Sequence, residues 1–306
     1  MIILLLLALA TLLSFALGYF RLVHYEARVA RHIPGDAAMV VRVDVKQVVL
    51  FEPVRRHVFP ALDGVSGDIA RRAKFERQAD VNLAMDLREV AVAFFDDGDW
   101  LVLIGGLFPS QGVVEALARV LGEDESFDCQ LERKALHCSE VVFEQAADGV
   151  IALGSSAPRV QQALQAGSHH PWLSDQPVSA GWSAAWADRE LFRTGDVGLE
   201  GARAAVDLTS SELEVTVHPR PASAPTAALE RWLAEARGAA QHLATNFAGE
   251  RAVLARARVT ERTGRPVIES HWTRDELDLA AANLGSWLKR RLASPQPSSA
   301  ASSTKP

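Results

Sequence analysis

The chain has 306 residues, a formal net charge of −6 and a hydrophobic content of 48%. That apolar content predicts a packed core, organised as one large domain or two modest ones. The acidic balance and the absence of a long Lys/Arg run argue against nucleic acid as a partner.

Residues 2–20, IILLLLALATLLSFALGYF, form an uncharged run. As a helix it approaches the roughly 30 Å hydrocarbon thickness of a bilayer, with Tyr19, Phe20 and Arg21 where interfacial residues end a span. A cleavable signal peptide is the alternative, but no Lys or Arg precedes the run, and the nearest small-residue cleavage pattern lies well past its end. We expect an uncleaved single-span anchor, with the lipid bilayer as its partner. Arg21, Arg28 and Arg31 follow the span, and the positive-inside rule would keep the next domain in the cytoplasm.

The next part of the chain predicts strands and helices in alternation. The stretch IPGDA at 33–37 ends the helix that leaves the membrane. Apolar strands are expected at 38–45, 86–95 and 100–108, with the turn DDGD at 96–99. Helices are expected at 71–79 and at 110–122, the second with Ser110 as a candidate N-cap and Gly122 as its stop.

The same order then recurs. A cysteine hairpin at 129–138 and strands at 139–145 and 150–154 precede a helix at 155–167, and residues 168–177 form a connector. Further strands are expected at 180–188, 202–208, 212–218, and in a hairpin around Thr263-Gly264. Helices are expected at 226–244 and 273–292, the last beginning with a capping box of Thr273 and Glu276.

These elements predict an α+β fold of mainly antiparallel strands, in one sheet or two, with helices on one face. The unit strand–strand–helix occurs four times, two per half, which indicates two duplicated ββα-ββα halves. We predict an anchor and juxtamembrane helix at 1–32, a first half at 33–175, a second half at 176–292 and a disordered tail at 293–306.

Cys129 and Cys138 are the two cysteines of the chain. In a hairpin with Arg133-Lys134 as the turn, they face each other on a non-hydrogen-bonded pair, where the Cα atoms lie about 4.5 Å apart and a disulfide fits. Arg-Lys is a poor turn dipeptide, and two free thiols remain the alternative. No CxxC motif and no second ligand pair for zinc accompany them. A disulfide would place the domain in an oxidising compartment, against the arginine flank.

Four short motifs resemble sites of known chemistry, but each has a simpler interpretation. The acids of DDGD lie between apolar strands, which favours a hairpin turn over a calcium loop. The stretch GSSAPR, residues 154–159, joins a strand to a helix without a phosphate-loop pattern, which favours serine capping. His169-His170 lies in a Pro-containing loop, and Ser286 to Lys289 match SxxK without its companion motifs. We expect no catalytic, metal-binding or cofactor-binding residues and no cofactor.

Three stretches, IPGDAAMVVRVDV at 33–45, MDLREVAVAFFDDGDWLVLIGGLF at 85–108 and DGVIALGSSAPRVQQALQAG at 148–167, resemble a group of uncharacterised bacterial exported proteins. In that group a hydrophobic N-terminal segment precedes a Pro-x-Asp-Ala stretch and ββα repeats. The resemblance covers about residues 33–292 and implies no activity.

The predicted function is that of a membrane-anchored, extracytoplasmic (periplasmic) protein. It would be non-enzymatic and act by binding or within an envelope assembly, with an envelope protein as partner. An envelope hydrolase with a dispersed active site and a cytoplasm-facing anchored domain are the alternatives.

Overall fold

The computed structural model describes residues 25–58, 60, 69–123, 127–165, 182–186, 201–208, 212–242 and 255–293. The anchor predicted at 2–20, the connector at 168–177 and the tail from residue 294 lie outside these described residues. Within them, no helix combines the length and the apolar character that crossing a bilayer requires.

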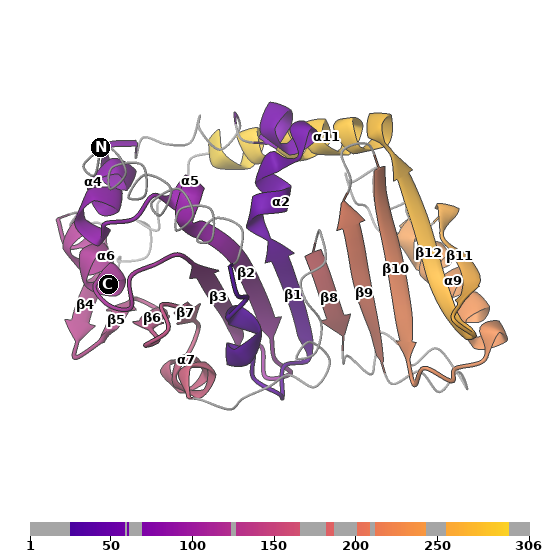
Figure 1. The fold of residues 1–306 in the computed structure, drawn as a ribbon, viewed down its shortest axis with the longest axis horizontal. Coiled ribbons are helices and arrows are strands. Elements are labelled where there is room, and N and C mark those ends of the chain that lie inside the picture. Colours follow the sequence, from indigo (N-terminus) through magenta and orange to yellow (C-terminus); the bar gives the residue numbers. More distant parts are fainter. Residues whose placement is uncertain are drawn as a thin grey trace, which may run out of the picture.

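The fold is α+β, and the described strands pair in antiparallel fashion throughout. Hydrogen bonds link them in one continuous series, in the order β11-β12-β10-β9-β8-β1-β2-β3-β7-β6-β5-β4 (Figure 1). The strands are β1 (Met39–Asp44), β2 (Leu87–Phe94), β3 (Trp100–Gly106), β4 (Cys129–Glu132), β5 (Ala135–Cys138), β6 (Val141–Gln145), β7 (Ile151–Gly154), β8 (Trp182–Trp186), β9 (Gly201–Leu208), β10 (Glu212–Arg220), β11 (Arg258–Arg262) and β12 (Arg265–Thr273).

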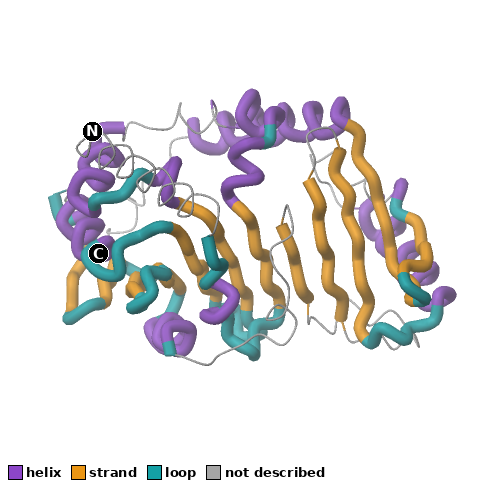
Figure 2. Tube along the Cα trace, in the orientation of Figure 1, coloured by secondary structure: helices purple, strands orange, loops and turns teal. Residues whose placement is uncertain are grey.

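Helical segments connect these strands and cover the sheet (Figure 2). They are η1 (Val29–His32), α2 (Val45–Leu50), η2 (Val54–Val58), α4 (Ile69–Ala79), α5 (Leu83–Asp86), α6 (Val113–Leu121), α7 (Ala157–Leu164), α9 (Thr226–His242) and α11 (Arg274–Ala293).

The strand order reads the same in two sets. From the centre outwards, β1-β2-β3-β7-β6 is matched by β8-β9-β10-β12-β11, and β1 pairs with β8 where the sets meet. One set contains the units β2-β3-α6 and β6-β7-α7, and the other contains β9-β10-α9 and β11-β12-α11. The four strand–strand–helix recurrences predicted from the sequence are therefore confirmed. The β4-β5 hairpin extends the first set.

Helical segments cover both faces of the first set, so the prediction of helices on one face is wrong. Leu101 and Leu103 of β3 belong to a core that includes Val29 of η1 and Val160 of α7. Ile104 points to the other face, because strand residues alternate, and packs against the core formed with α4 and α6. The physical reason is the sequence of β3, WLVLIGG, in which no polar residue alternates with the apolar ones. Such a strand must be buried on both faces.

In the second set, α9 supplies the main apolar cover. Leu229 and Leu233 of α9 pack in one core with Ala202 of β9 and Ile268 of β12. The last helix, α11, lies along one end of the sheet and contacts η2 (Figure 1). Gly285 makes this approach close, because a Cβ there would lie 2.2 Å from the His57 carbonyl oxygen.

The predicted helix signals at the starts of two helices have different outcomes. At α11 one half of the capping box forms: the Thr273 N–H donates to the Glu276 carboxylate at 3.0 Å, and the Thr273 hydroxyl donates to the same carboxylate. Ser110 does not cap α6, which begins at Val113 after Gly112. Gly112 has a φ of 94°, a conformation that favours glycine, and the chain enters the helix through it.

Candidate functional site

The segment that leads into β1 is fixed to the sheet by one buried carboxylate, that of Glu89 in β2. Glu89 Oε1 accepts hydrogen bonds from Tyr25 Oη at 2.8 Å and from the backbone N–H groups of Arg28 and Val29 at 2.6 and 3.0 Å. Its Oε2 accepts from Arg42 Nη2 at 2.7 Å. The Arg42 and Glu89 side chains are each 3% exposed. We call these contacts the Glu89 network. Burial and the adjacent Glu89 carboxylate raise the pKa of Tyr25, so its hydroxyl remains a donor.

The docked segment passes close to β3 at Gly105. A Cβ at Gly105 would lie 2.6 Å from Tyr25 Oη and 2.7 Å from Val29 Cγ2, so glycine leaves the space the segment occupies. Val29 and Ile33 are fully buried. Val29 and Ile33 therefore belong to the core of the first set of strands. Their segment forms the 3₁₀ turn η1 rather than a continuation of a long juxtamembrane helix.

His32 joins the same segment to two further elements. Its Nδ1 lies 2.9 Å from the carbonyl oxygen of Ala163 in α7, and its Nε2 lies 2.9 Å from Asp148 Oδ2. Arg28 Nη1 donates to the Asp148 carbonyl at 2.5 Å. Partial burial of Asp148 opposes its ionisation, but hydrogen bonds from His32 and the Val150 N–H, together with the charges of His32 and Arg28, outweigh it and lower the pKa of Asp148. The N-terminal segment is thus held by both β2 and the β6-β7 turn.

Three motifs noted in the sequence meet at the other end of the first set of strands. Arg159, from GSSAPR, donates to Asp36 of IPGDA at 2.6 Å and to Asp97 of DDGD at 2.7 Å. Its Nε lies 3.6 Å from Asp99, and its guanidinium carbon lies 4.1 Å from the centre of the Phe95 ring. We call Asp36, Asp97, Asp99 and Arg159 the aspartate–arginine cluster.

Two serines complete this cluster. Ser155 Oγ donates to Asp99 Oδ1 at 2.8 Å, and Ser156 Oγ donates to Asp99 Oδ2 at 2.9 Å. Ser156 occupies the N-cap position of α7, but its hydroxyl oxygen accepts no hydrogen bond from the backbone N–H groups of the first turn. The predicted serine capping is therefore wrong in its chemistry, because the hydroxyls bind the DDGD turn instead.

The one cation of the aspartate–arginine cluster, Arg159, is shared among three carboxylates. The hydrogen bond from Arg159 lowers the pKa of Asp97, and hydrogen bonds to Asp97 and Asp36 raise the pKa of Arg159. Ser155 and Ser156 donate to a carboxylate, whereas a serine nucleophile needs a base that accepts its proton. In the described part of the chain, no group of three His, Cys, Asp or Glu side chains could hold a metal ion. The cluster ties three loops together.

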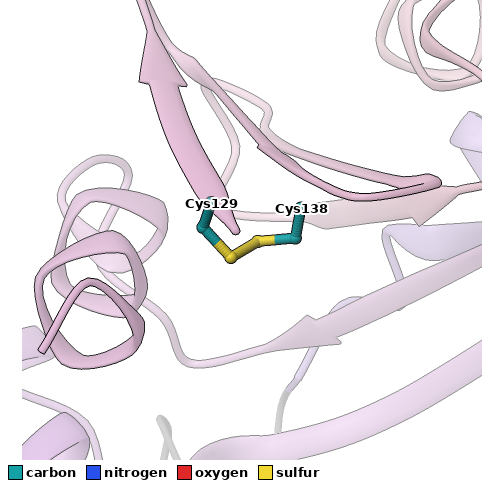
Figure 3. Close-up of a disulfide and its surroundings, with 2 residues drawn as sticks. All are labelled: Cys129 and Cys138. Carbon is teal, nitrogen blue, oxygen red and sulfur yellow. A yellow bond between two sulfur atoms is a disulfide. The ribbon is translucent and has the colours of Figure 1, made fainter. Parts of the chain in front are cut away.

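The cysteine hairpin has the predicted register. Cys129 pairs with Cys138, Leu131 with Leu136 and Glu132 with Ala135. A disulfide joins the two cysteines, whose Cα atoms lie 4.1 Å apart (Figure 3). This separation is that of the closer, non-hydrogen-bonded kind of pair.

The turn of this hairpin is formed by Arg133 and Lys134, a dipeptide whose composition is unfavourable for a two-residue turn. Arg133 adopts a φ of 57°, which an L-residue other than glycine or asparagine rarely does. Two-residue hairpin turns of the primed types require such a φ at their first central position. The Arg-Lys dipeptide thus adopts the hairpin turn in spite of its composition.

The remaining sequence candidates do not converge on a site. Ser286 and Lys289 are exposed on α11. His169-His170 lies outside the described residues. An open, shallow depression between α4 and α5 is lined by Glu76, Arg77, Asp80, Asn82 and Asp86, among others. Two of its carboxylates are used locally, since Glu76 accepts from the Leu83 N–H and Asp86 from the Asn82 N–H.

The chain matches no family model and no curated protein. Its structure is similar to that of TP0453. Crystal form I of TP0453 matches over 89% of this chain and 100% of that chain, with a TM-score of 0.48 and 10% sequence identity. Crystal form III matches over 85% and 99%, with a TM-score of 0.48 and 9% identity. This degree of likeness carries no argument about activity.

The Glu89 network is the feature that sequence reasoning missed. Part of its signal was present as charged residues, Arg42 and Glu89, inside largely apolar strands. A buried charge needs a partner of opposite sign, but Arg88 stands next to Glu89 in the same strand, so the sequence does not show which residues pair. The part played by Tyr25 depends on the path of residues 25–33, which no local pattern indicates.

Proposed function

We propose that this chain is a membrane-anchored protein whose α+β domain lies outside the cytoplasm and acts by binding, as a component of an envelope assembly. The disulfide between Cys129 and Cys138 carries the proposal. Structural disulfides persist in oxidising compartments and are rare in the cytosol. This bond lies in a short hairpin at the edge of the sheet, where it stabilises a strand with little core of its own.

The anchor is the uncharged run of residues 2–20, and its supporting evidence is the length and composition of that run. The described chain begins at Tyr25, already bound to Glu89. A span ending at Phe20 would therefore be followed almost at once by a segment packed into the domain core. Such an arrangement suits a domain that is held in a fixed orientation near the bilayer.

A binding role is favoured over catalysis by the way the polar clusters are used. The donors of Arg159, Ser155 and Ser156 are directed at carboxylates of the same cluster. The Glu89 carboxylate accepts five hydrogen bonds from four residues of the protein itself. These groups fix loops and segments to one another, as a rigid scaffold for an interaction surface requires.

Thiol labelling of the native chain tests the proposal. Membranes prepared in the presence of an alkylating reagent and without reductant should yield protein with both cysteines unlabelled, and labelling should follow reduction. Two labelled cysteines before reduction would overturn the extracytoplasmic location. The double variant Cys129→Ser/Cys138→Ser is the control for reaction at other side chains.

A cytoplasm-facing anchored domain is the second candidate, and Arg21, Arg28 and Arg31 favour it. The positive-inside rule counts such residues close to a span. In the folded domain Arg28 binds the Asp148 carbonyl and Arg31 pairs with Glu26. Those two arginines therefore have structural roles that would account for their presence in an exported domain.

We also infer that the two sets of strands arose by duplication, as two halves near residues 33–175 and 176–292. The matching strand order and the antiparallel pairing of β1 with β8 support it, because a two-fold axis between these strands would exchange the sets. The β4-β5 hairpin with its disulfide is then an addition to the first half.

A further inference from the structure

Several helical segments gather at one end of the sheet. There β1 ends at Asp44, which pairs with Glu89, and the chain continues into α2. At the same end α5 leads into β2, and β12 ends at Thr273 and continues into α11. Figures 1 and 2 show α2, α5 and α11 along this end. We call α2, η2, α5 and α11 the helical rim.

The helical rim exposes large apolar side chains. Leu50 at the end of α2 is 63% exposed, Met85 of α5 is 54% exposed and Leu279 of α11 is 60% exposed. A single exposed leucine is ordinary on a protein surface. Three such side chains on elements that share one end of the sheet need a common explanation. Apolar side chains that enter the headgroup region of a bilayer provide one.

We propose that the helical rim lies against the surface of the lipid bilayer, with Leu50, Met85 and Leu279 in the interface. The proposal rests on the anchor of the proposed function and adds to it the orientation of the domain. Phe20 ends the uncharged run, and Tyr25 follows five residues later. A chain spans at most about 3.3–3.6 Å per residue, so Tyr25 lies within roughly 18 Å of the end of the span.

Because Tyr25 has a fixed place in the fold, this short connection to the span sets the orientation of the domain relative to the bilayer. Tyr25 Oη donates a hydrogen bond to Glu89, and Glu89 is the strand partner of Asp44 at the rim end of β1. The strand β1 starts at Met39, near Asp36, at the opposite end of the sheet, and it ends at Asp44 at the rim. A short tether attached at the rim end brings that end of the sheet, and not the other, to the bilayer.

The charges at the two ends of the first set agree with this orientation. On the rim they are paired: Glu52 binds Arg56 and Arg274, and Asp278 lies 3.3 Å from Arg56 and 3.1 Å from His57. The opposite end carries the aspartate–arginine cluster, where Asp36, Asp97 and Asp99 surround one arginine. Anionic headgroups repel that excess of acidic groups, whereas the rim carboxylates Glu52 and Asp278 each have a basic partner.

Single-cysteine probes on the full chain test the orientation. The chain is reconstituted into vesicles of phosphatidylethanolamine and phosphatidylglycerol, with a thiol-reactive fluorophore at Leu50→Cys, Met85→Cys or Leu279→Cys. Matched controls are Phe94→Cys and Leu131→Cys, which are 43% and 44% exposed and lie away from the rim. Nitroxide-labelled lipids then report how near each probe lies to the bilayer. If the native cysteines take up label, the Cys129→Ser/Cys138→Ser background is used.

The rim probes should be quenched several-fold more strongly than the two controls, and their emission should shift to shorter wavelength. Equal quenching of all five probes, in a chain that resists alkaline extraction from the vesicles, would overturn the orientation and leave the anchor intact. Release of the native chain by alkaline extraction would instead refute the anchor, and with it this proposal. Strong quenching at position 94 and weak quenching at position 279 would show the reverse orientation.

Discussion

Arg42 of β1 and Glu89 of β2 form an ion pair from which water is almost wholly removed. Arg42 Nη2 lies 2.7 Å from Glu89 Oε2, and each side chain is 3% exposed. Removing two charges from water has a large desolvation cost, which is offset only when the remaining hydrogen-bonding capacity is satisfied. Here Tyr25 and two backbone N–H groups fill the other oxygen of Glu89. The pair therefore stabilises the fold together with the docked N-terminal segment.

Replacing Glu89 tests this directly. Glu89→Gln leaves the Arg42 guanidinium buried without a counter-charge, and we expect a loss of about 3–5 kcal/mol in the free energy of unfolding. Urea denaturation followed by circular dichroism measures it. Glu123→Gln is the control, because Glu123 pairs with Lys74 at the surface and should contribute less than about 1 kcal/mol. Equal losses for the two variants would contradict the role of the network.

Gly105 should not tolerate a methyl group. In Gly105→Ala the new Cβ would meet Tyr25, Val29 and Glu89 at 2.6, 2.7 and 2.8 Å. We expect destabilisation of about 1–3 kcal/mol and faster proteolysis within residues 25–33. Gly238→Ala in α9 is the matched control, since no described residue lies within 4 Å of its added Cβ. That variant should gain up to about 1 kcal/mol from helix propensity.

The disulfide should contribute to stability through the short loop it closes. We expect the Cys129→Ser/Cys138→Ser variant to lose about 2–3 kcal/mol in the free energy of unfolding on the loop-entropy model. Reducing the native chain should produce a similar loss, whereas the variant should not respond to reductant. A native chain whose unfolding is unchanged by reductant would show that the bond does not form or does not stabilise the fold.

Replacing Arg88 should stabilise the protein, in contrast to the preceding destabilising variants. Arg88 is 8% exposed, and its Nε and Nη2 atoms have no hydrogen-bond partner among the residues that the structure describes. Because burying an unsatisfied polar group costs roughly 1–3 kcal/mol, Arg88→Met should raise the melting temperature. Arg42→Met, which removes a paired arginine from the neighbouring strand, should lower it. A drop in melting temperature for both variants would indicate that Arg88 has a partner in solution.

Acid should loosen the contact between His32 and Asp148. The folded-state pKa of Asp148 is lowered, so its contribution is complete above the ordinary carboxyl pKa of about 4 and is lost as the pH falls through the folded value. We expect the unfolding free energy of the native chain to decrease below about pH 4. Asp148→Asn should be less stable than the native chain at pH 7 and should lose less on acidification. Parallel pH profiles for the two proteins would contradict this coupling.

Much of the fold could be predicted from alternation and turn residues. The four strand–strand–helix units, the register of the cysteine hairpin and the Thr263-Gly264 turn all follow from local patterns. The number of covered faces was mispredicted, although the uninterrupted apolar sequence of β3 indicated burial on both sides.

The clusters could not be predicted, because their members come from distant parts of the chain. Asp36, Asp97 and Arg159 meet only after β1, β2, β3 and β7 have paired. Ser156 looked like a helix cap because capping is a local rule. A carboxylate that approaches from another hairpin can redirect its hydroxyl, as Asp99 does, and no sequence spacing reveals that approach.

A topology reporter fused after residue 292 tests the extracytoplasmic location most directly. Two reporters are compared, a phosphatase that is active only after export and a fluorescent protein that matures only in the cytoplasm. Each is fused to residues 1–292 of the chain. We predict phosphatase activity and no fluorescence. Fluorescence without phosphatase activity would place the domain in the cytoplasm, beside the arginine flank, and would contradict the account.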